Sequence, residues 1–561
     1  MTVSAFDGVD CTKRVNRAIS SAQYMRNFRI TPEGSLSKRY GYRAVIKSSD
    51  ITSVYVFESV ILYQRESTVY ACDENGNIIR EYEMQSDTPF SYFTFANRAY
   101  IVSEDMVAYY YDGWFYDAAP YVPTVAIAAP NSGGGTVHES LNLLCNKAKM
   151  TFSPNGKGGD FVLPSIAKSV ISVTENGEPL IDQDYQYDEK THTLKMSYIP
   201  DGTVSESLCV TFETYDEKKP SDLLYGKDFC VYGTSVDSRV FFYGGDNVIY
   251  YSDITADGAD PLYIPAENYI TVGDGGKVTS LIRHYSTLCV FTDKDAWYIT
   301  VSSVDYDGYV RPSFPIFPLN SKIGCVRGGG ALVDNCPVSV NGTGVYKWVS
   351  TTVRDERNAK CISDKISALL SEEFLRRCRA CDLECYKELW IYANGVSAVY
   401  SYASDAWYFF DGIDALTVLQ YKGEALLLKN DGIYVFDRDV YTDDGKAYTA
   451  IWQSGFADFG RLGRKHLYRL YVSMLPETNS RITVTLLPNN AERVTLGENG
   501  EFSNPVFDFA CIDFSNFTFE CEGRPNLQRH RVRLRRFDSL RLVIECSEPN
   551  ARATVERVVL Q

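Results

Sequence analysis

Short apolar stretches separated by a few polar residues run through most of this chain from residue 52 onward. Seven of these stretches share one form, in which an apolar strand leads through a polar tip to a second apolar strand. Two apolar runs joined by turn-forming residues are typical of a β-hairpin. The predicted hairpins are residues 60–73, 99–113, 239–253, 288–301, 337–350, 399–412 and 425–439.

The recurrence of these hairpins predicts the fold class. A hairpin repeated about every 25–50 residues is typical of a β-propeller, in which each blade buries its faces against its neighbours. We therefore predict an all-β protein whose β-propeller has about seven blades, built from residues 46–129 and 221–445. Because the repeats share form and not sequence, unrelated hairpins in two sandwiches are the alternative.

Two further parts are expected outside the propeller. Residues 130–220 begin with the linker "PNSGGG" and continue as short strands with turn signals, so they predict a β-sandwich inserted between the second and third blades. Residues 446–561 contain strands such as "RITVTLLP" and predict a C-terminal β-sandwich. One helix is expected at 363–379, with Ser363 as its cap.

Residues 1–45 are predicted to form an arm that consists of a helix and a hairpin. Small and apolar residues recur at helical spacing in 12–26, which favours a short helix there. The following segment, "NFRITPEGSLSKRYGYR" (27–43), is typical of a hairpin with basic residues on both strands. Pro32 and Gly34 suit a type I turn between those strands.

Composition supports the β prediction and limits the other classes. The chain has 561 residues, which suggests about three to four domains, and its 41 Tyr favour pleated, half-buried surfaces. No apolar run approaches the ~18–20 residues that cross a bilayer, and the first residues do not resemble a secretory signal. The 15 scattered cysteines are therefore expected to be reduced thiols in a chain folded in a cytosol.

Charge is distributed unevenly along the chain. Residues 1–45 contain 8 Lys or Arg and 3 Asp or Glu, whereas the propeller segments together contain 24 and 43. Residues 446–561 are slightly basic again, with 16 and 13. The question that this distribution raises is why an acidic propeller follows a basic arm.

Candidate catalytic and metal-ligating residues are few. Cys378, Cys381 and Cys385, with Cys361 upstream, match no standard zinc spacing, and a helix end packed on a core explains them better. None of the five histidines has a Ser or Cys partner in a nucleophilic motif. We therefore predict no catalytic residues, no metal and no cofactor. A propeller could still bring two carboxylates together for glycoside chemistry, so an enzyme remains an alternative.

Several stretches together resemble one protein family. "MRNFRITPEGSLSKRYGYR" (25–43) is similar to the N-terminal signature of phage tail structural proteins, except that Tyr40 replaces the usual residue before the signature glycine. The block from 241 to 300 resembles the central block of that family. "GVYKWVSTTVRDERNAKCISDKI" (344–366) and "WQSGFADFG" (452–460) are similar to a third and a C-terminal block. The group includes tail nozzle proteins and packaged-DNA stabilisation proteins of short-tailed phages.

The resemblance implies a virion structural protein of the tail, synthesised in the host cytoplasm. It implies a nozzle or tail-hub ring, usually a hexamer, that retains packaged DNA and forms part of its exit channel. The expected partners are copies of the chain itself, other tail or portal-adaptor proteins, tail fibres and the host cell surface. DNA would pass without sequence-specific binding, and we expect acidic propeller residues to approach its path. A receptor-binding adhesin and, less favoured, a propeller enzyme acting on cell-wall glycan are the alternatives.

Two basic segments are candidate assembly interfaces. The N-terminal hairpin could dock on a neighbouring subunit or tail ring, or it could complete the first blade. In "RHRVRLRRF" (529–537), alternate residues are Arg, so a strand would present them on one face. The predicted interface residues are Arg26, Asn27, Arg29, Lys38, Arg39, Arg529, Arg531, Arg533 and Arg535. For the second segment, an acidic surface of a neighbouring copy is favoured over DNA phosphate and over local carboxylates.

Overall fold

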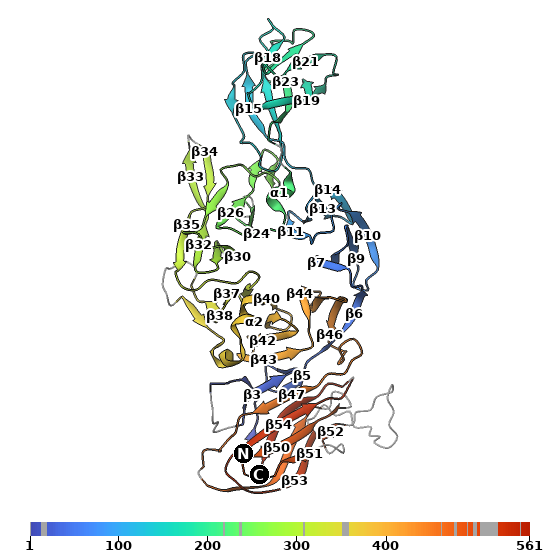
Figure 1. The fold of residues 1–561 in the computed structure, drawn as a ribbon, viewed down its shortest axis with the longest axis vertical. Helices are drawn as coiled ribbons and strands as arrows, with labels where there is room; N and C mark the ends of the chain where they lie inside the picture. Colours follow the sequence, from blue (N-terminus) through green and yellow to red (C-terminus); the bar gives the residue numbers. More distant parts are fainter. Residues whose placement is uncertain are drawn as a thin grey trace.

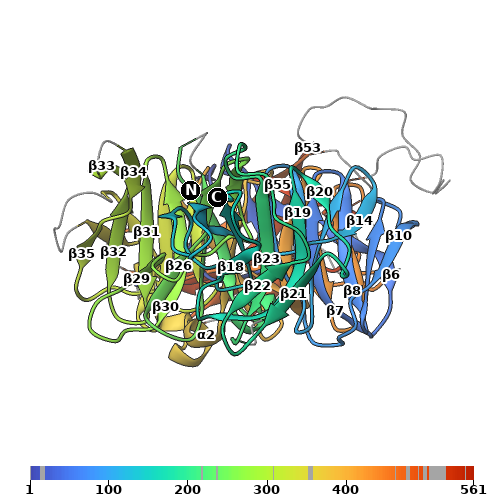
Figure 2. The same cartoon turned by 90° about the horizontal axis from the view of Figure 1, so that it is seen from above.

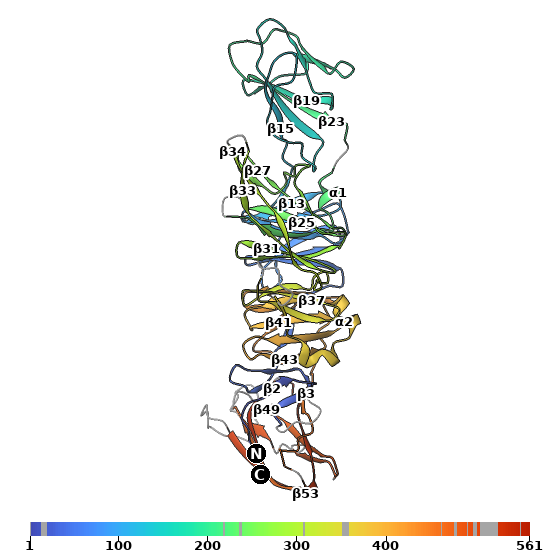
Figure 3. The ribbon, with the colours of Figure 1, turned by 90° about the vertical axis from the view of Figure 1, so that its left-hand side faces the viewer.

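The computed structural model shows an elongated molecule of three parts, with a propeller between two sandwiches (Figures 1 and 3). Both termini lie in the sandwich at one end, and the inserted sandwich forms the other end. The structure describes residues 2–561 except 13–18, 217–218, 235–237, 307–308, 351–357, 462, 476–479, 491, 497–501, 505–525 and 550.

The propeller has seven four-stranded blades within the described part of the chain, as predicted. The first blade contains β7 (Ile51–Phe57), β8 (Val60–Arg65), β9 (Thr68–Cys72) and β10 (Ile78–Glu83), and the second contains β11 (Ser91–Phe95), β12 (Arg98–Val102), β13 (Val107–Tyr111) and β14 (Trp114–Asp117). The third contains β24 (Asp228–Tyr232), β25 (Arg239–Tyr243), β26 (Val248–Tyr251) and β29 (Tyr269–Thr271), and the fourth contains β30 (Val278–His284), β31 (Thr287–Thr292), β32 (Ala296–Thr300) and β35 (Ile316–Asn320).

The other three blades complete the ring. The fifth contains β36 (Gly330–Val333), β37 (Cys336–Asn341), β38 (Gly344–Trp348) and β39 (Ala359–Cys361), and the sixth contains β40 (Arg379–Leu383), β41 (Glu388–Ala393), β42 (Val396–Ser401) and β43 (Ala406–Asp411). The seventh contains β44 (Ala415–Tyr421), β45 (Glu424–Lys429), β46 (Gly432–Asp437) and, from the N-terminal region, β6 (Gly41–Lys47). Hairpins β27 (Asp253–Thr255)/β28 (Gly258–Asp260) and β33 (Ser302–Tyr306)/β34 (Tyr309–Ser313) are additions to the third and fourth blades.

The inner strands form a closed circle. Contacts run from β7 to β11, β24, β30, β36, β40 and β44, and from β44 back to β7. Separate apolar clusters fill the spaces between successive blades, for example between the seventh and first blades and between the first and second. Each blade is therefore buried on both faces by its neighbours, which is why the ring requires all of them.

Rows of aromatic rings cross whole blades and explain much of the tyrosine content. In the second blade, Phe93, Tyr100, Tyr109 and Tyr116 lie opposite one another on successive strands, and adjacent ring centroids are 4.9, 5.7 and 5.2 Å apart. Phe93 also stacks on Phe229 of the third blade at 4.5 Å. Such cross-strand aromatic pairs stabilise antiparallel sheets.

The N-terminal and C-terminal segments together build the terminal sandwich. One sheet contains β1 (Thr2–Val3), β4 (Phe28–Ile30), β5 (Leu36–Lys38), β48 (Lys465–Met474), β53 (Asn526–Phe537) and β55 (Thr554–Leu560). The other contains β2 (Asp7–Val9), β3 (Ser21–Arg26), β47 (Ala450–Ser454), β50 (Thr483–Pro488), β51 (Val494–Leu496) and β54 (Leu540–Cys546), and it joins the sixth blade through β3 and β43. Two short strands, β49 (Ser480–Arg481) and β52 (Ser503–Asn504), form a separate two-stranded sheet.

The predicted arm of residues 1–45 is not a separate part, and the helix expected at 12–26 is wrong where the structure describes it. Residues 21–26 form the central strand β3 because β47 supplies its hydrogen bonds on one side and its apolar residues enter the sandwich core. Residues 13–18 of the predicted helix lie outside the described residues. Tertiary pairing thus overrides a helical spacing of small residues.

The inserted domain is a two-sheet sandwich, as predicted. Its larger sheet contains β15 (Thr124–Ala129), β16 (Thr136–Val137), β17 (Lys147–Phe152), β19 (Ala167–Glu175), β20 (Glu178–Pro179) and β23 (Leu208–Thr214). The smaller sheet contains β18 (Asp160–Val162), β21 (Tyr185–Asp188) and β22 (Thr193–Met196). This domain projects from the rim of the ring (Figure 1), so a view along the long axis, in which the ring is seen edge-on, places it in front with blades on both sides (Figure 2).

Helix is scarce. α1 (Pro220–Leu224) leads from the inserted sandwich to the third blade. The helix expected at 363–379 is divided into a 3-10 turn, Asp364–Leu369, and α2 (Glu372–Arg377), because Leu370 is extended and Ser371 caps a new helix by accepting a bond from Phe374 N. No helix in the described ranges has the length and apolar character needed to cross a membrane.

Candidate functional site

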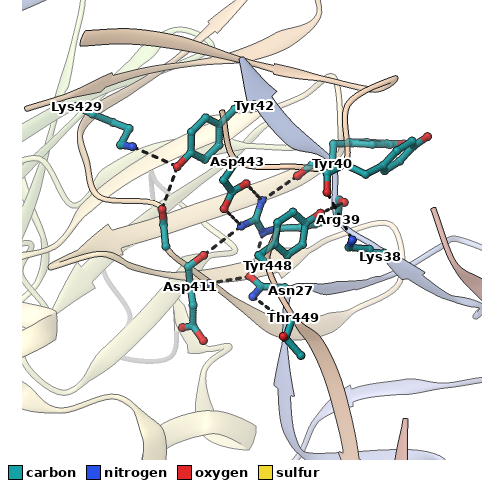
Figure 4. A network of polar contacts seen from close by, with 12 residues as sticks. Asn27, Lys38, Arg39, Tyr40, Tyr42, Asp411, Lys429, Asp443, Tyr448 and Thr449 are labelled. Carbon is teal, nitrogen blue, oxygen red and sulfur yellow. Dashed lines mark hydrogen bonds and ion pairs between the residues drawn. The ribbon is translucent and has the colours of Figure 1, made fainter. Parts of the chain in front are cut away.

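The basic N-terminal hairpin is present as β4 and β5 in a sheet of the terminal sandwich, and Figure 4 shows polar contacts of its residues with Asp411, Asp443 and Thr449. β4 and β5 pair through a turn in which Thr31 Oγ1 accepts a bond from Ser35 N and Gly34 has a φ of +84°. β5 then pairs with β55 of the sandwich, and the next strand, β6, pairs along β46 of the seventh blade. We call residues 27–47 the clasp because they join the sandwich to the propeller and close the ring.

Arg39 is the centre of the clasp and is 0% exposed. Its two terminal nitrogens donate to the two carboxylate oxygens of Asp443 at 2.8 and 2.6 Å, and its Nε donates to Asn27 Oδ1 at 2.9 Å. The Tyr448 ring covers the guanidinium at 3.8 Å. Burial opposes the charge, but the bonds and the charge of Asp443 more than offset it, so the pKa of Arg39 is raised.

The neighbours of Arg39 are buried with it. Lys38 is 0% exposed and donates to the Glu548 carbonyl at 2.7 Å, and burial lowers its pKa. Asn27 donates to the Thr449 carbonyl at 2.9 Å and accepts a bond from Asp411 N at 3.0 Å. These contacts tie the hairpin to the sixth blade and to the first strand of the C-terminal segment.

A second buried ion pair supports the hairpin from the sixth blade. The Arg29 guanidinium lies 2.6 Å from Glu388 and within 4.8 and 4.5 Å of the ring centroids of Tyr40 and Tyr386. Glu388 is 2% exposed and also accepts bonds from Tyr408 and Trp390. Burial disfavours the charge of Arg29, and the neighbouring Glu388 raises the pKa nonetheless.

The prediction that this hairpin is a docking surface is therefore wrong for the residues that carry it. Lys38, Arg39 and Asn27 are buried inside the chain, and Arg29 and Arg26 face Glu388 and Asp411 of the same chain. The alternative, that 27–43 completes the first blade, is also corrected, because β6 completes the seventh. The partners Glu388 and Asp443 were missed, since they lie 359 and 404 residues away from Arg29 and Arg39 and only the fold brings them near.

The second basic segment has the predicted alternation. On β53, Val532 and Leu534 are 2% exposed, whereas the arginines at 529, 531, 533 and 535 are exposed. No carboxylate among the described residues forms an ion pair with these four arginines. The prediction of local Asp and Glu partners thus has no support in the described part of the sandwich.

The inner strands of the propeller carry few charged residues. These seven strands contain two aspartates, Asp228 and Asp382, and two arginines, Arg283 and Arg379. These strands are therefore balanced in charge, and the expectation that acidic propeller residues approach the path of DNA stays a prediction.

Thiol chemistry has no assembled site in the described residues. Burial raises the pKa of Cys378 and Cys381 to about 12 and that of Cys385 to about 11, so these thiols are protonated. No group of three or more His, Cys, Asp or Glu in the described ranges is placed to hold a metal ion. The absence of a metal and of a cofactor remains a prediction.

One carboxyl group in the ring has a strongly shifted pKa. Burial, and then the charges of Glu384 and Asp334, raise the pKa of Asp382 to about 7. Its Oδ1 is buried without a hydrogen-bond partner among the described residues. A carboxyl group in such a place is neutral in the folded chain near and below that pH.

We expect Asp382→Asn to remove a pH dependence of stability. The folded chain holds the proton of Asp382 more tightly than the unfolded chain, whose Asp pKa is about 3.9. The contribution of Asp382 to stability is therefore complete below about pH 4 and is lost as pH rises through about 7. Thermal unfolding should show the variant more stable than the wild-type chain at pH 8 and little different at pH 4. An equal effect at both pH values would contradict this.

The comparisons with known proteins concern the fold. The sequence matches no family model and no curated protein. Among solved structures, the chain is similar to the Pan2 WD40 domain of Neurospora crassa (7% identity, TM-score 0.33, 72% of this chain and 96% of that one). It is also similar to the AfRom2 CNH domain (6% identity, TM-score 0.33, 70% and 97%). An exo-β-1,3-galactanase from Phanerochaete chrysosporium matches with 9% identity and a TM-score of 0.16, over 84% and 95% of the two chains. These scores support no functional assignment.

Proposed function

We propose that this chain is a virion structural protein of a phage tail, and that it forms a nozzle or tail-hub ring which retains packaged DNA. The observation that carries the proposal is the clasp. The motif behind the family resemblance is the segment that joins the sandwich to the propeller in this chain.

Several positions of the signature have a structural role in the clasp. Phe28 and Leu36 are 0% exposed in the shared core, and Gly34 supplies the left-handed turn residue. Arg39 holds Asp443, and Gly41 lies so close to the Thr442 backbone that a Cβ would be 2.1 Å from its carbonyl oxygen. A motif that meets these constraints is part of what this architecture requires. This supports the interpretation that its match to the family signature is not accidental.

The central block of the resemblance has a comparable local basis. In the fourth blade, Thr292 Oγ1 donates to Asp295 Oδ1 at 2.5 Å, and the Trp297 indole donates to the same oxygen at 2.9 Å. The backbone nitrogens of Lys294 and Asp295 donate to Thr292 Oγ1. This network fixes the tip of a blade hairpin. The block from 241 to 300 therefore also contains residues with a structural role, which supports the proposed function in the same way.

The inserted sandwich favours a second role in the same particle. It projects from the ring at the end opposite the termini (Figure 3), and several of its apolar side chains are exposed, including Val137 (85%), Ile181 (62%) and Ile199 (58%). Exposed apolar residues at such a projecting end suit contact with a tail fibre or with the host surface. A receptor-binding adhesin is therefore the second candidate function.

Quantitative mass spectrometry of purified particles tests the proposal. We expect the chain in several copies per particle, close to six, measured against a tail protein of known copy number. Particles made without it should lose packaged DNA. Absence of the chain from particles, or a single copy per particle, would overturn the ring. Release of sugars from host cell wall by the purified protein would favour an enzyme instead.

A further inference from the structure

Two exposed strands, one in the terminal sandwich and one in the propeller, are complementary to each other in charge. One is β53, the last strand in the described order of its sheet, and the other is β10, the outermost strand of the first blade. We propose that β53 of one copy binds β10 of the next copy in a head-to-tail contact. This inference rests on the proposed function, since it assigns the surfaces that would join subunits of the ring.

The β53 side is strongly basic. β48 and β53 lie side by side and together contain seven Lys or Arg and no Asp or Glu. Arg469 of β48 lies directly opposite Arg531 of β53, and both are exposed. Like charges in directly opposed positions destabilise a sheet, so this face favours a partner that supplies carboxylates.

The β10 side is acidic around an apolar centre. On β10 and on residues 111–117, four exposed carboxylates outnumber the single guanidinium of Arg80. These carboxylates belong to Glu81, Glu83, Asp112 and Asp117. Ile78 and Ile79 are 55% and 44% exposed, and Trp114 is 52% exposed beneath Arg80 at 3.8 Å. β10 and β14 contact each other at one side of the ring (Figures 1 and 2).

The residue order on the two strands matches in one alignment. Glu81 and Glu83 share one face of β10, beyond a register shift between Ile78 and Arg80, and Leu527, Arg529 and Arg531 share one face of β53. A parallel alignment places each glutamate opposite an arginine, with the exposed Ile78 and Ile79 at the end where Leu527 lies, which is 53% exposed. Because both faces repeat at every second residue, about 6.6–7 Å apart, the charges stay in step along the strands.

A second copy of the chain suits this surface better than nucleic acid. A contact between two different surfaces is heterologous, and it closes into a ring when the rotation between subunits allows it. The partner strand supplies an apolar residue for Leu527 as well as carboxylates for the arginines, which a phosphate backbone does not do. Exposed aromatic and apolar side chains on both sides are the residue types found at the centres of interfaces.

Charge-reversal variants of the full chain test the contact. The face variant reverses basic charges of β53 (Arg529→Glu/Arg531→Glu), and the rim variant reverses acidic charges of β10 (Glu81→Arg/Glu83→Arg). Sedimentation of each at high protein concentration and low salt should show association weakened by about 100-fold or more, because like charges would meet. The variant Arg533→Glu/Arg535→Glu changes arginines beyond the matched residues and should weaken the association less. Lys168→Glu/Lys195→Glu, which reverses exposed charges of the inserted sandwich, should leave it unchanged.

Mixing distinguishes a head-to-tail contact from other modes. Each variant alone should associate weakly, but the intact surface of one matches the intact surface of the other, and their two reversed surfaces match as well, so a mixture of the face and rim variants should associate again. The variant with all four reversals should associate with itself again. Circular dichroism and melting temperature confirm that each variant is folded.

Three outcomes would overturn the proposal: a wild-type chain that stays monomeric under these conditions, variants that associate normally, or no recovery in the four-fold variant. Binding of duplex DNA by the wild-type chain, lost in the face variant, would overturn it in favour of nucleic acid. The copy number in particles is a separate measurement, so failure of this contact is distinguishable from failure of the proposed function.

Discussion

Replacing Asp443 with Ala should destabilise the junction of propeller and sandwich by about 3–5 kcal/mol, because it leaves the charge of Arg39 buried without its partner. Arg39 is 0% exposed and donates two bonds to this carboxylate. The remaining acceptors around the guanidinium, including Asn27 Oδ1 and the Tyr40 and Asp411 carbonyls, are neutral. None of them replaces the lost charge.

Two further variants isolate the cause of that loss. Asp228→Ala removes the carboxylate of an exposed ion pair with Arg327 and should cost less than about 1 kcal/mol. The double variant Arg39→Met/Asp443→Leu removes both charges and should recover much of the loss. Denaturant unfolding and limited proteolysis at the junction measure the effect. An Asp443→Ala protein as stable as Asp228→Ala would show that the pair does not hold the junction.

Replacing Gly41 with Ala should open the ring, with a cost of about 3 kcal/mol or more. A Cβ at this position would lie 2.1 Å from the Thr442 carbonyl oxygen and 2.6 Å from Thr442 N, and backbone atoms cannot move aside as a flexible side chain can. Gly41 begins β6, so the strand that completes the seventh blade would shift away from β46. The first and seventh blades would then lose part of the core that they share.

Gly342→Ala is the matched control for this substitution. The nearest atoms to its added Cβ are side-chain atoms at 3.7 Å, which is an ordinary contact, so its stability should change little. Hydrogen exchange along β6 and β46 should rise in the Gly41 variant and stay unchanged in the control. Equal stability and equal exchange in the two variants would contradict the role of β6 in ring closure.

The propeller was predictable because its signal is local and repeated. Each blade contributes a hairpin of adjacent strands, such as β8 and β9, and the polar tips show between the apolar runs. The alternation of Arg529 to Arg535 was predictable for the same reason, since the period of a strand alone determines which side chains share a face.

The clasp was not predictable from local pattern. Residues 12–26 read as helix because small and apolar residues recur there at helical spacing, and only pairing with β47 makes 21–26 a strand. The sequence correctly predicts a hairpin at 27–43, but its basic residues were expected on the molecular surface. Lys38 and Arg39 are buried because Glu548 and Asp443, far along the chain, supply acceptors, and no periodicity records such long-range partners.

Single-particle electron microscopy of purified phage particles would show directly whether this chain is a ring protein of the tail. We expect density for this propeller, flanked by its two sandwiches, in a ring of copies in the tail. Density for the propeller outside the tail, or particles that lack it altogether, would show that the chain has another role.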